Sequence, residues 1–135
     1  MNTPIKFDAR LTKNQSLVLN TLLEADKPLT AYSILDALRD RGLKAPLQVY
    51  RAISKLLEIG VIHRLDSLNA FVPCQLDSSD CNIRKTVIFA ICLECGKAQE
   101  VSDSLTVDAI QNISRNTNFR LENSVTEIRG LCANC

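Results

Sequence analysis

The sequence predicts an α+β fold made of two small domains, the first with three helices and a β-hairpin and the second with a mixed β-β-α-β unit. Three apolar segments with helical periodicity and short connections fill the first half. Two C-x-x-C pairs lie in the second half, each following a predicted strand. The charge also divides, since residues 1–73 carry 10 Lys and Arg against 7 Asp and Glu, whereas residues 74–135 carry 6 against 8. A basic front half and an acidic rear half suggest two tasks in one chain.

The first two predicted helices have recognisable starts and stops. Thr12 and Gln15 have the spacing of a capping box, and leucines follow them at helical intervals. The second helix is expected to begin after Thr30, a natural N-cap, and to stop at Gly42. The connections between the helices are short, as in a helix-turn-helix.

The third predicted helix follows Pro46, ends at Gly60 and has two distinct faces. At 100° per residue the apolar side is formed by Val49, Ile53, Leu56 and Leu57, and the polar side by Gln48, Arg51, Ser54 and Lys55. In an isolated helix, basic residues on such a face are more often simply solvated than bound to a partner. The face alone therefore leaves both interpretations open.

Residues 61–73 contain two β-rich runs around the polar residues 66–69, which is typical of a β-hairpin. Three helices followed by a hairpin describe a winged helix, a fold that commonly lays its third helix in the DNA major groove. We therefore expect residues 1–73 to form a winged-helix DNA-binding domain. The polar segment 74–84 is expected to be a linker or hinge.

Residues 85–135 are expected to form a small α/β domain. The predicted elements are strands at 86–91 and 97–101, a helix at 104–116 with core candidates Leu105, Ile110 and Ile113, and at 119–132 one strand or two with a turn at 122–124. A unit of about 50 residues is small for independent stability. It needs a staple, a partner or both.

Four of the six cysteines form the pairs Cys92–Cys95 and Cys132–Cys135. Two C-x-x-C units supply the four thiolates of a closed, tetrahedral structural zinc site, and Gly96 suits the tight turn that the first pair needs. The alternative is a pair of redox dithiols, which predicts a thioredoxin-like βαβ context that neither pair has. The sequence therefore favours a four-cysteine structural zinc site that staples the second domain.

A second metal site is a weaker prediction from spacing. In the predicted hairpin His63 lies across from Val72, so that Cys74 falls near it, while Cys81 in the linker and Glu100 on a following strand can complete the set. Two thiolates bias such a site toward Zn²⁺ and away from harder metals. The alternative is that the histidine is a surface or packing residue and that Cys74 is simply buried.

No run of 18 or more apolar residues exists, and the first ten residues lack the apolar stretch of a signal peptide. We therefore expect a cytoplasmic protein, in which reduced cysteine pairs more often hold metal than form disulfides.

Four segments taken together resemble the Fur family of metal-responsive repressors, and within it the zinc uptake regulators (Zur). They are "LTAYSILDALR", "APLQVYRAISKLLEIGVIHRLDSLNAFVPC", "ICLECGKAQEV" and "GLCANC", and the resemblance runs from about residue 11 to the end. It implies a homodimer, in which each chain carries a winged helix and an α/β dimerisation domain. It also implies that metal bound between the domains permits binding to operator DNA.

The resemblance carries over to particular residues. It implies that the structural zinc site is formed by Cys92, Cys95, Cys132 and Cys135, that sensing-site ligands are His63, Cys74 and Glu100, and that DNA is contacted by Tyr32, Tyr50 and Arg51. Family members usually have histidines before the first C-x-x-C, and this chain has none there. Cys81 is the obvious substitute, with Asp77 or Asp80 as alternatives. The missing histidines also count against an iron or peroxide sensor.

The expected function is a zinc-responsive transcriptional repressor that binds operator DNA as a zinc-loaded homodimer and controls zinc uptake genes. It would hold two Zn²⁺ per chain, read bases through Arg51 and contact phosphates through Lys55 and Arg64, with Gln48 as a further DNA-binding residue. No enzymatic activity, membrane association or small-molecule substrate is expected. The alternatives are a thiol/disulfide redox-sensing regulator, a Fur-family sensor of another metal, and a zinc-stapled interaction module that never binds DNA.

Overall fold

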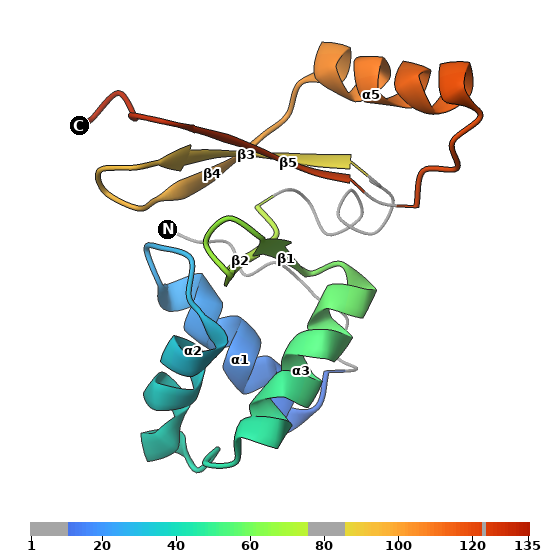
Figure 1. Cartoon of the computed structure of the whole chain (residues 1–135). Coiled ribbons are helices and arrows are strands. Elements are labelled where there is room, and N and C mark those ends of the chain that lie inside the picture. Colours follow the sequence, from blue (N-terminus) through green and yellow to red (C-terminus); the bar gives the residue numbers. More distant parts are fainter. Residues whose placement is uncertain (1–10, 76–85, 123) are drawn as a thin grey trace. The chain divides into compact units, whose positions relative to one another are not determined.

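The structure, a computed structural model, describes residues 11–75, 86–122 and 124–135 of the chain. It contains helices and β-sheets, which confirms the predicted α+β class (Figure 1). The chain divides into two compact units, Met1–Asn82 and Ile83–Cys135. Each unit has its own sheet.

The first unit begins with three α-helices. Their bounds are α1 Lys13–Glu24, α2 Ala31–Leu38, continued by a short 3-10 turn η1 Arg39–Arg41, and α3 Pro46–Ile59. The predicted capping box is confirmed, because the Thr12 N–H donates to Gln15 Oε1 at 3.1 Å and the Gln15 N–H to Thr12 Oγ1 at 3.2 Å. Thr30 likewise caps α2, accepting a hydrogen bond from the Ser33 N–H at 3.1 Å.

Two glycines end the helical segments as the sequence predicts. Gly42 has φ +92° and Gly60 has φ +84°, a left-handed conformation that side chains with a Cβ rarely adopt. Pro46 is the first residue of α3, where its missing N–H costs nothing. The helix α2 is shorter than predicted, because its last turn tightens to 3-10 geometry at Arg39.

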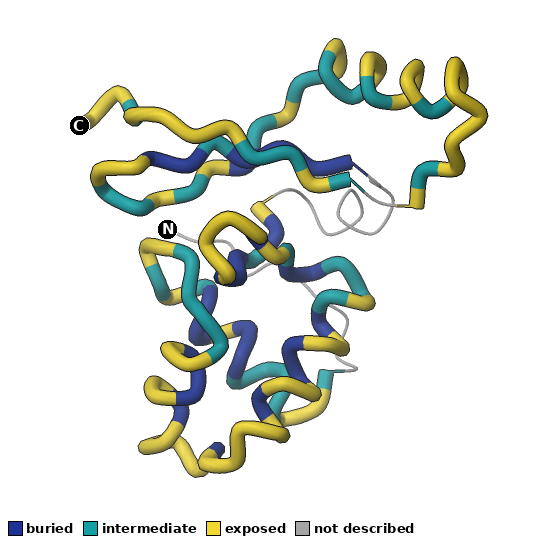
Figure 2. Tube along the Cα trace, viewed as in Figure 1, coloured by how far each residue is buried: buried dark blue, intermediate teal, exposed yellow. Residues whose placement is uncertain are grey.

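The three helices bury their apolar faces against one another in a single core (Figure 2). Val18 and Leu22 of α1 pack with Ile34 of α2, and all three are almost completely buried. The predicted apolar side of α3 is confirmed, since Val49, Ile53 and Leu56 are buried and Leu57 packs against the core. This core fixes which face of α3 points outward.

A β-hairpin follows α3, with strands β1 Ile62–Leu65 and β2 Ala70–Pro73. The strands pair antiparallel with His63 opposite Val72, in the predicted register. Phe71 also exchanges two backbone hydrogen bonds with Leu29, at 2.8 and 3.0 Å, and so ties the hairpin to the segment before α2. No sequence pattern predicts this bridge, because a single pair of residues has no periodicity.

The second unit contains a three-stranded sheet with the order β4-β3-β5. The strands are β3 Thr86–Cys92, β4 Ala98–Val101 and β5 Ser124–Gly130 (Figure 1). β3 pairs antiparallel with β4 and parallel with β5, so that the apolar β3 is central and β5 is an edge strand. For residues 119–132 the sequence predicted either one strand or two. The structure describes one strand there, β5.

The helix α5, Ser104–Thr117, corrects a prediction. Of its expected core residues, Leu105 is 77% exposed and Ile113 is 61% exposed, while Ile110 is half-buried. No residue of this helix is buried (Figure 2). The helical period was therefore correct and the assignment to the core was wrong, because no described residue of the chain buries these side chains.

Among the residues that the structure describes, no helix has both the length and the apolar character needed to span a bilayer.

Candidate metal centres and nucleic-acid interface

The first cysteine pair lies in the turn that follows β3. Cys92 is the last residue of the strand, and its N–H donates to the Lys97 carbonyl oxygen at 2.9 Å. Gly96 closes the turn with φ +76°, and its N–H donates to the Cys92 carbonyl oxygen at 3.0 Å. The tight turn predicted for Gly96 is therefore present, and it folds Cys95 back toward Cys92.

The second pair meets the first because β3 and β5 are parallel neighbours. Cys92 is in register with Gly130, and the Leu93 N–H donates to the Gly130 carbonyl oxygen at 2.8 Å. Both strands therefore end at the same edge of the sheet, and each is followed there by a C-x-x-C turn. The Cys135 N–H donates to the Cys132 carbonyl oxygen at 3.2 Å within the second turn.

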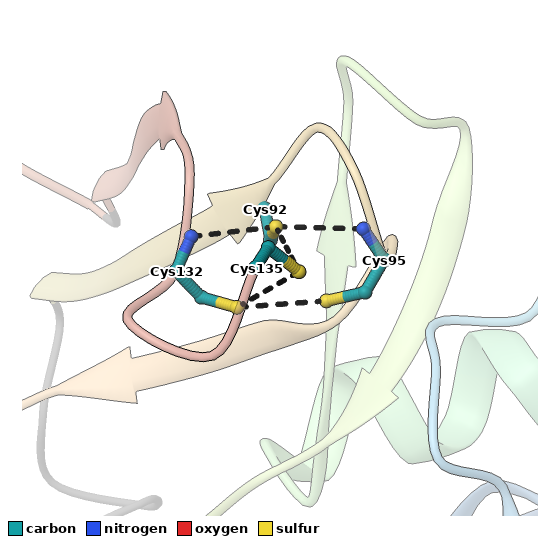
Figure 3. A group of neighbouring side chains, drawn as sticks. All are labelled: Cys92, Cys95, Cys132 and Cys135. Atoms are coloured by element: carbon teal, nitrogen blue, oxygen red, sulfur yellow. Dashed lines mark hydrogen bonds between the residues drawn. The ribbon is translucent and has the colours of Figure 1, made fainter.

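The four sulfur atoms converge on one point (Figure 3). The Sγ–Sγ distance is 3.7 Å from Cys92 to Cys135, 3.8 Å from Cys95 to Cys132 and 3.4 Å from Cys132 to Cys135. Four sulfurs at the usual Zn–S distance of about 2.3 Å stand about 3.8 Å apart at the corners of a tetrahedron. The donor set and its spacing thus fit a closed tetrahedral zinc site.

The environment of the sulfurs is uneven. The N–H groups of Cys95 and Cys132 donate to Cys92 Sγ, each at 3.4 Å, and these hydrogen bonds lower the pKa of the Cys92 thiol to about 6. Hydrogen bonding to Cys132 and Cys92 raises the pKa of the Cys135 thiol to about 12. Four thiolates at this spacing repel one another, so a cation among them is what allows all four to ionise.

The hairpin brings two further candidate ligands together in the first unit. His63 lies on β1, and Cys74 directly follows β2, where its N–H donates to the Val61 carbonyl oxygen at 2.9 Å. Ligand atoms of His63 and Cys74 lie within 4.8 Å of each other, and Cys74 is 1% exposed. Burial lowers the pKa of His63 to about 4, so that its imidazole is neutral at pH 7, the form that binds metal.

Cys74 is disulfide-bonded in this structure, whereas Cys92, Cys95, Cys132 and Cys135 are free thiols. A thiolate ligand is the reduced form of the residue. Metal binding at Cys74 therefore requires that this bond be reduced.

The remaining predicted ligands of the second site belong to other parts of the chain. Glu100 belongs to the second unit, where it is buried on β4 opposite Phe89 of β3. Cys81 and its alternatives Asp77 and Asp80 lie outside the described residues. A buried carboxylate is costly unless it is paired, hydrogen-bonded or bound to metal.

The six residues predicted to contact DNA all belong to the first unit and are all exposed. They are Tyr32, Gln48, Tyr50, Arg51, Lys55 and Arg64. Tyr32 is 69% exposed and Tyr50 is 55% exposed, which is unusual for large aromatic side chains without a partner. Lys55 forms an ion pair with Glu58 at 3.7 Å, an exposed contact that is weak enough to exchange for a phosphate.

The sequence analysis missed two features near the predicted DNA contacts, one on α3 and one on the β1–β2 hairpin. Leu47, in the first turn of α3, is 58% exposed, and a helical wheel of the third segment would have placed it outward. Arg64 is held at the hairpin by Asn69 Oδ1 at 3.0 Å and by Asp66 Oδ1 at 3.3 Å. Asn69 adopts a left-handed φ of +48°, which asparagine tolerates in turns.

The order of helices, hairpin and cysteine-containing sheet agrees with a comparison of the chain with known protein families. The profile of the ferric uptake regulator family matches residues 6–129. The chain therefore belongs to the ferric uptake regulator family, as the resemblance in its motifs indicated.

Within this family the chain is similar to zinc uptake regulators. The zinc uptake regulation proteins of Escherichia coli (strain K12) and of Shigella flexneri are each 34% identical over 129 residues, which cover 95% of this chain and 74% of each relative. The crystal structure of holo XcZur is 36% identical, covers 93% of this chain and 86% of that chain, and superposes with a TM-score of 0.83. A zinc uptake regulator complexed with zinc and DNA is 35% identical, covers 93% of this chain and 83% of that chain, and gives a TM-score of 0.85.

Proposed function

We propose that this protein is a zinc-responsive transcriptional repressor that binds operator DNA as a zinc-loaded homodimer and controls zinc uptake genes. The observation that carries the proposal is the convergence of four thiols at the spacing of a tetrahedral zinc site. The relatives support the same metal, since similar proteins are named zinc uptake regulators and one was solved with zinc and DNA.

The two units take separate tasks in this proposal. Residues 1–73 act as a winged-helix DNA-binding domain, in which α3 enters the major groove and the β1–β2 hairpin is the wing. Residues 74–84 act as the hinge, and residues 85–135 as the dimerisation domain. The exposed basic side chains of α3 support the first assignment, and the exposed apolar side chains of α5 and β5 support the last.

Each chain would hold two zinc ions. The first is structural and would be held by Cys92, Cys95, Cys132 and Cys135. The second is regulatory and would be held by His63, Cys74, Cys81 and Glu100, with Asp77 or Asp80 as alternatives to Cys81. A zinc ion would hold the ligands of each set together, and thiolate ligands favour it over Mn²⁺.

The regulatory ligands come from the hairpin, the hinge and the sheet of the second unit. Side chains that shared one ion would restrict how the DNA-binding domains of a dimer can turn. The recognition helices are then held at the separation of a palindromic operator. Without a shared ion, the cost of fixing the orientation of the domains would lower the affinity for DNA.

The two sites as proposed leave no place for catalysis. A catalytic zinc keeps an open coordination position and a base nearby, whereas four sulfurs close the first site. The arrangement thus favours a regulator over an enzyme.

The test of this function is a binding titration in reductant with and without zinc. The protein as isolated should contain one tightly held and one removable zinc ion per chain, measured by atomic spectrometry before and after mild chelation. Removal of the second ion should release a palindromic operator in a gel-shift assay, and zinc should restore the complex. If the protein releases the operator through reversible disulfides and without losing a metal ion, the redox-sensing alternative is favoured.

Replacing Arg51 by alanine should relax operator specificity. A guanidinium can contact guanine O6 and N7 with two hydrogen bonds, and such a pair contributes about 1–3 kcal/mol of discrimination. The measurement compares the affinities of both proteins for the operator and for single-base variants. As a control, Lys55→Ala should weaken all sequences alike and lower the salt dependence. A uniform loss for Arg51→Ala would show that it contacts phosphate instead.

Replacing Ile113 by glutamate should weaken the dimer. Ile113 is 61% exposed on a helix that has no buried residue, and a second copy that covers it would have to bury a carboxylate. We expect the dimer dissociation constant to rise at least about tenfold, which corresponds to about 1.4 kcal/mol. Sedimentation measures this, and Gln111→Glu, an exposed polar position of the same helix, is the control. Equal dissociation constants would place the interface elsewhere.

A further inference from the structure

The outward face of α3 has a leucine at its centre. The core takes the opposite side, where Val49, Ala52, Ile53 and Leu56 are buried. At 100° per residue, the direction away from these side chains is that of Leu47, flanked by Arg51 and Ser54 on the following turns. Leu47 is 58% exposed, so the core does not account for an apolar residue here.

The charge around Leu47 identifies what this face binds. Between Asp40 and Glu58 the chain has no acidic residue, and it has four cations, Arg41, Lys44, Arg51 and Lys55. The first acidic residue of α3, Glu58, lies in its last turn and pairs with Lys55. A helix whose only charges before its last turn are cationic, Arg51 and Lys55, matches the phosphates that line a DNA groove, and the N-terminal residues of a recognition helix reach the base edges.

The chemistry of Leu47 selects one group in that groove. The major groove displays hydrogen-bond donors and acceptors at every base pair, and its apolar group is the C5-methyl of thymine. A leucine cannot hydrogen-bond to base edges, and burying it against polar groups alone would leave those groups unsatisfied. Contact with a thymine methyl group buries the leucine and leaves no polar group of the base edges without a hydrogen bond.

The helix also fixes where this thymine lies. Leu47 and Arg51 are four residues apart, which is about 6 Å along the axis of an α-helix. Successive base pairs are about 3.4 Å apart along the duplex. The two side chains therefore reach positions about two base pairs apart.

We propose that Leu47 is a specificity-determining residue that reads a thymine methyl group in each operator half-site, about two base pairs from the base that Arg51 contacts. This inference rests on the proposed function and names a base that the operator must contain. Leu47 acts by direct apolar contact, next to the hydrogen bonds of Arg51.

The test uses operator duplexes that the zinc-loaded protein selects from random DNA. Each thymine of the half-site is replaced in turn by deoxyuridine, which removes only the methyl group, and affinities are measured by fluorescence anisotropy. For the unsubstituted protein, one thymine position should cost about fourfold per half-site, the effect of one buried methyl group. For Leu47→Ala the same deoxyuridine should cost nothing, while Leu47→Met should restore part of the response.

A matched control truncates another exposed leucine of the same unit. Leu68 lies in the β1–β2 turn and is 38% exposed, and Leu68→Ala should keep the response to deoxyuridine at that position. If no duplex is selected in the presence of zinc, the proposed function itself fails. If a duplex is selected and every deoxyuridine affects the unsubstituted protein and Leu47→Ala equally, the function stands and the role of Leu47 is overturned.

Discussion

Replacing Cys135 by serine is expected to remove the structural zinc ion and to unfold the second unit. Zinc binding contributes about 10–16 kcal/mol to the folding of small zinc-binding peptides. Whole domains are stable by only about 5–15 kcal/mol, and the buried side chains that the structure describes in this unit lie mostly on the single strand β3, since α5 buries none. The loss of one of four sulfur ligands should therefore remove the fold of Ile83–Cys135 and, with it, the dimer.

Three measurements check this expectation. Zinc per chain should fall by one ion, gel filtration should show no dimer, and the far-ultraviolet circular dichroism should lose the contribution of the second unit. Asn134→Ser, which places the same side chain on the neighbouring exposed residue, should leave all three unchanged. A Cys135→Ser protein that stays dimeric with its full metal content would contradict a structural role for the site.

The first unit could be predicted almost completely from its sequence. Its signals are local, since a capping box at Thr12, a proline at the start of α3 and left-handed glycines at Gly42 and Gly60 each act within a few residues. The register of the hairpin followed from its turn. The buried face of α3 followed from its period.

In the candidate sites, too, the local features could be predicted and the long-range ones could not. The four-thiol cluster was predictable, because the C-x-x-C spacing itself fixes how two sulfurs of a turn meet one ion. The parallel pairing of β3 with β5 was not, because it joins strands that are far apart in the sequence. The exposure of Leu105 and Ile113 could not be predicted either. An apolar helix has the same sequence pattern whether its own chain or a second copy covers it.

The second large effect is expected at the regulatory site. Replacing Cys81 by serine should leave the dimer and the structural zinc ion intact and should abolish the zinc dependence of operator binding. Couplings between two ligands of one protein are typically about 1–3 kcal/mol, a factor of about 5–150. We expect zinc to raise the operator affinity of the unsubstituted protein within this range, and that of Cys81→Ser by less than about twofold. His63→Gln should behave in the same way.

Two further variants test which residue of the proposed hinge completes the proposed regulatory site. Asp77→Asn and Asp80→Asn keep the size of the side chain and remove its charge. If Cys81 is the ligand, both aspartate variants should respond to zinc as the unsubstituted protein does. If one of them loses the response while Cys81→Ser keeps it, that aspartate completes the site with His63 and Cys74.

Linkage gives the sharpest form of this prediction, because the coupling must be reciprocal. If zinc raises the affinity for the operator by a given factor, operator DNA must raise the affinity for the regulatory zinc ion by the same factor. Competition with a zinc chelator, with and without operator duplex, measures the second factor independently of the first. Equal factors in the unsubstituted protein, both reduced to one in Cys81→Ser, would assign the coupling to this site. The contrary result has two parts: the operator affinity changes when Cys74 is oxidised, and it does not change with zinc when the reductant is held constant. Metal linkage cannot produce that result, which would make the hinge a thiol switch instead.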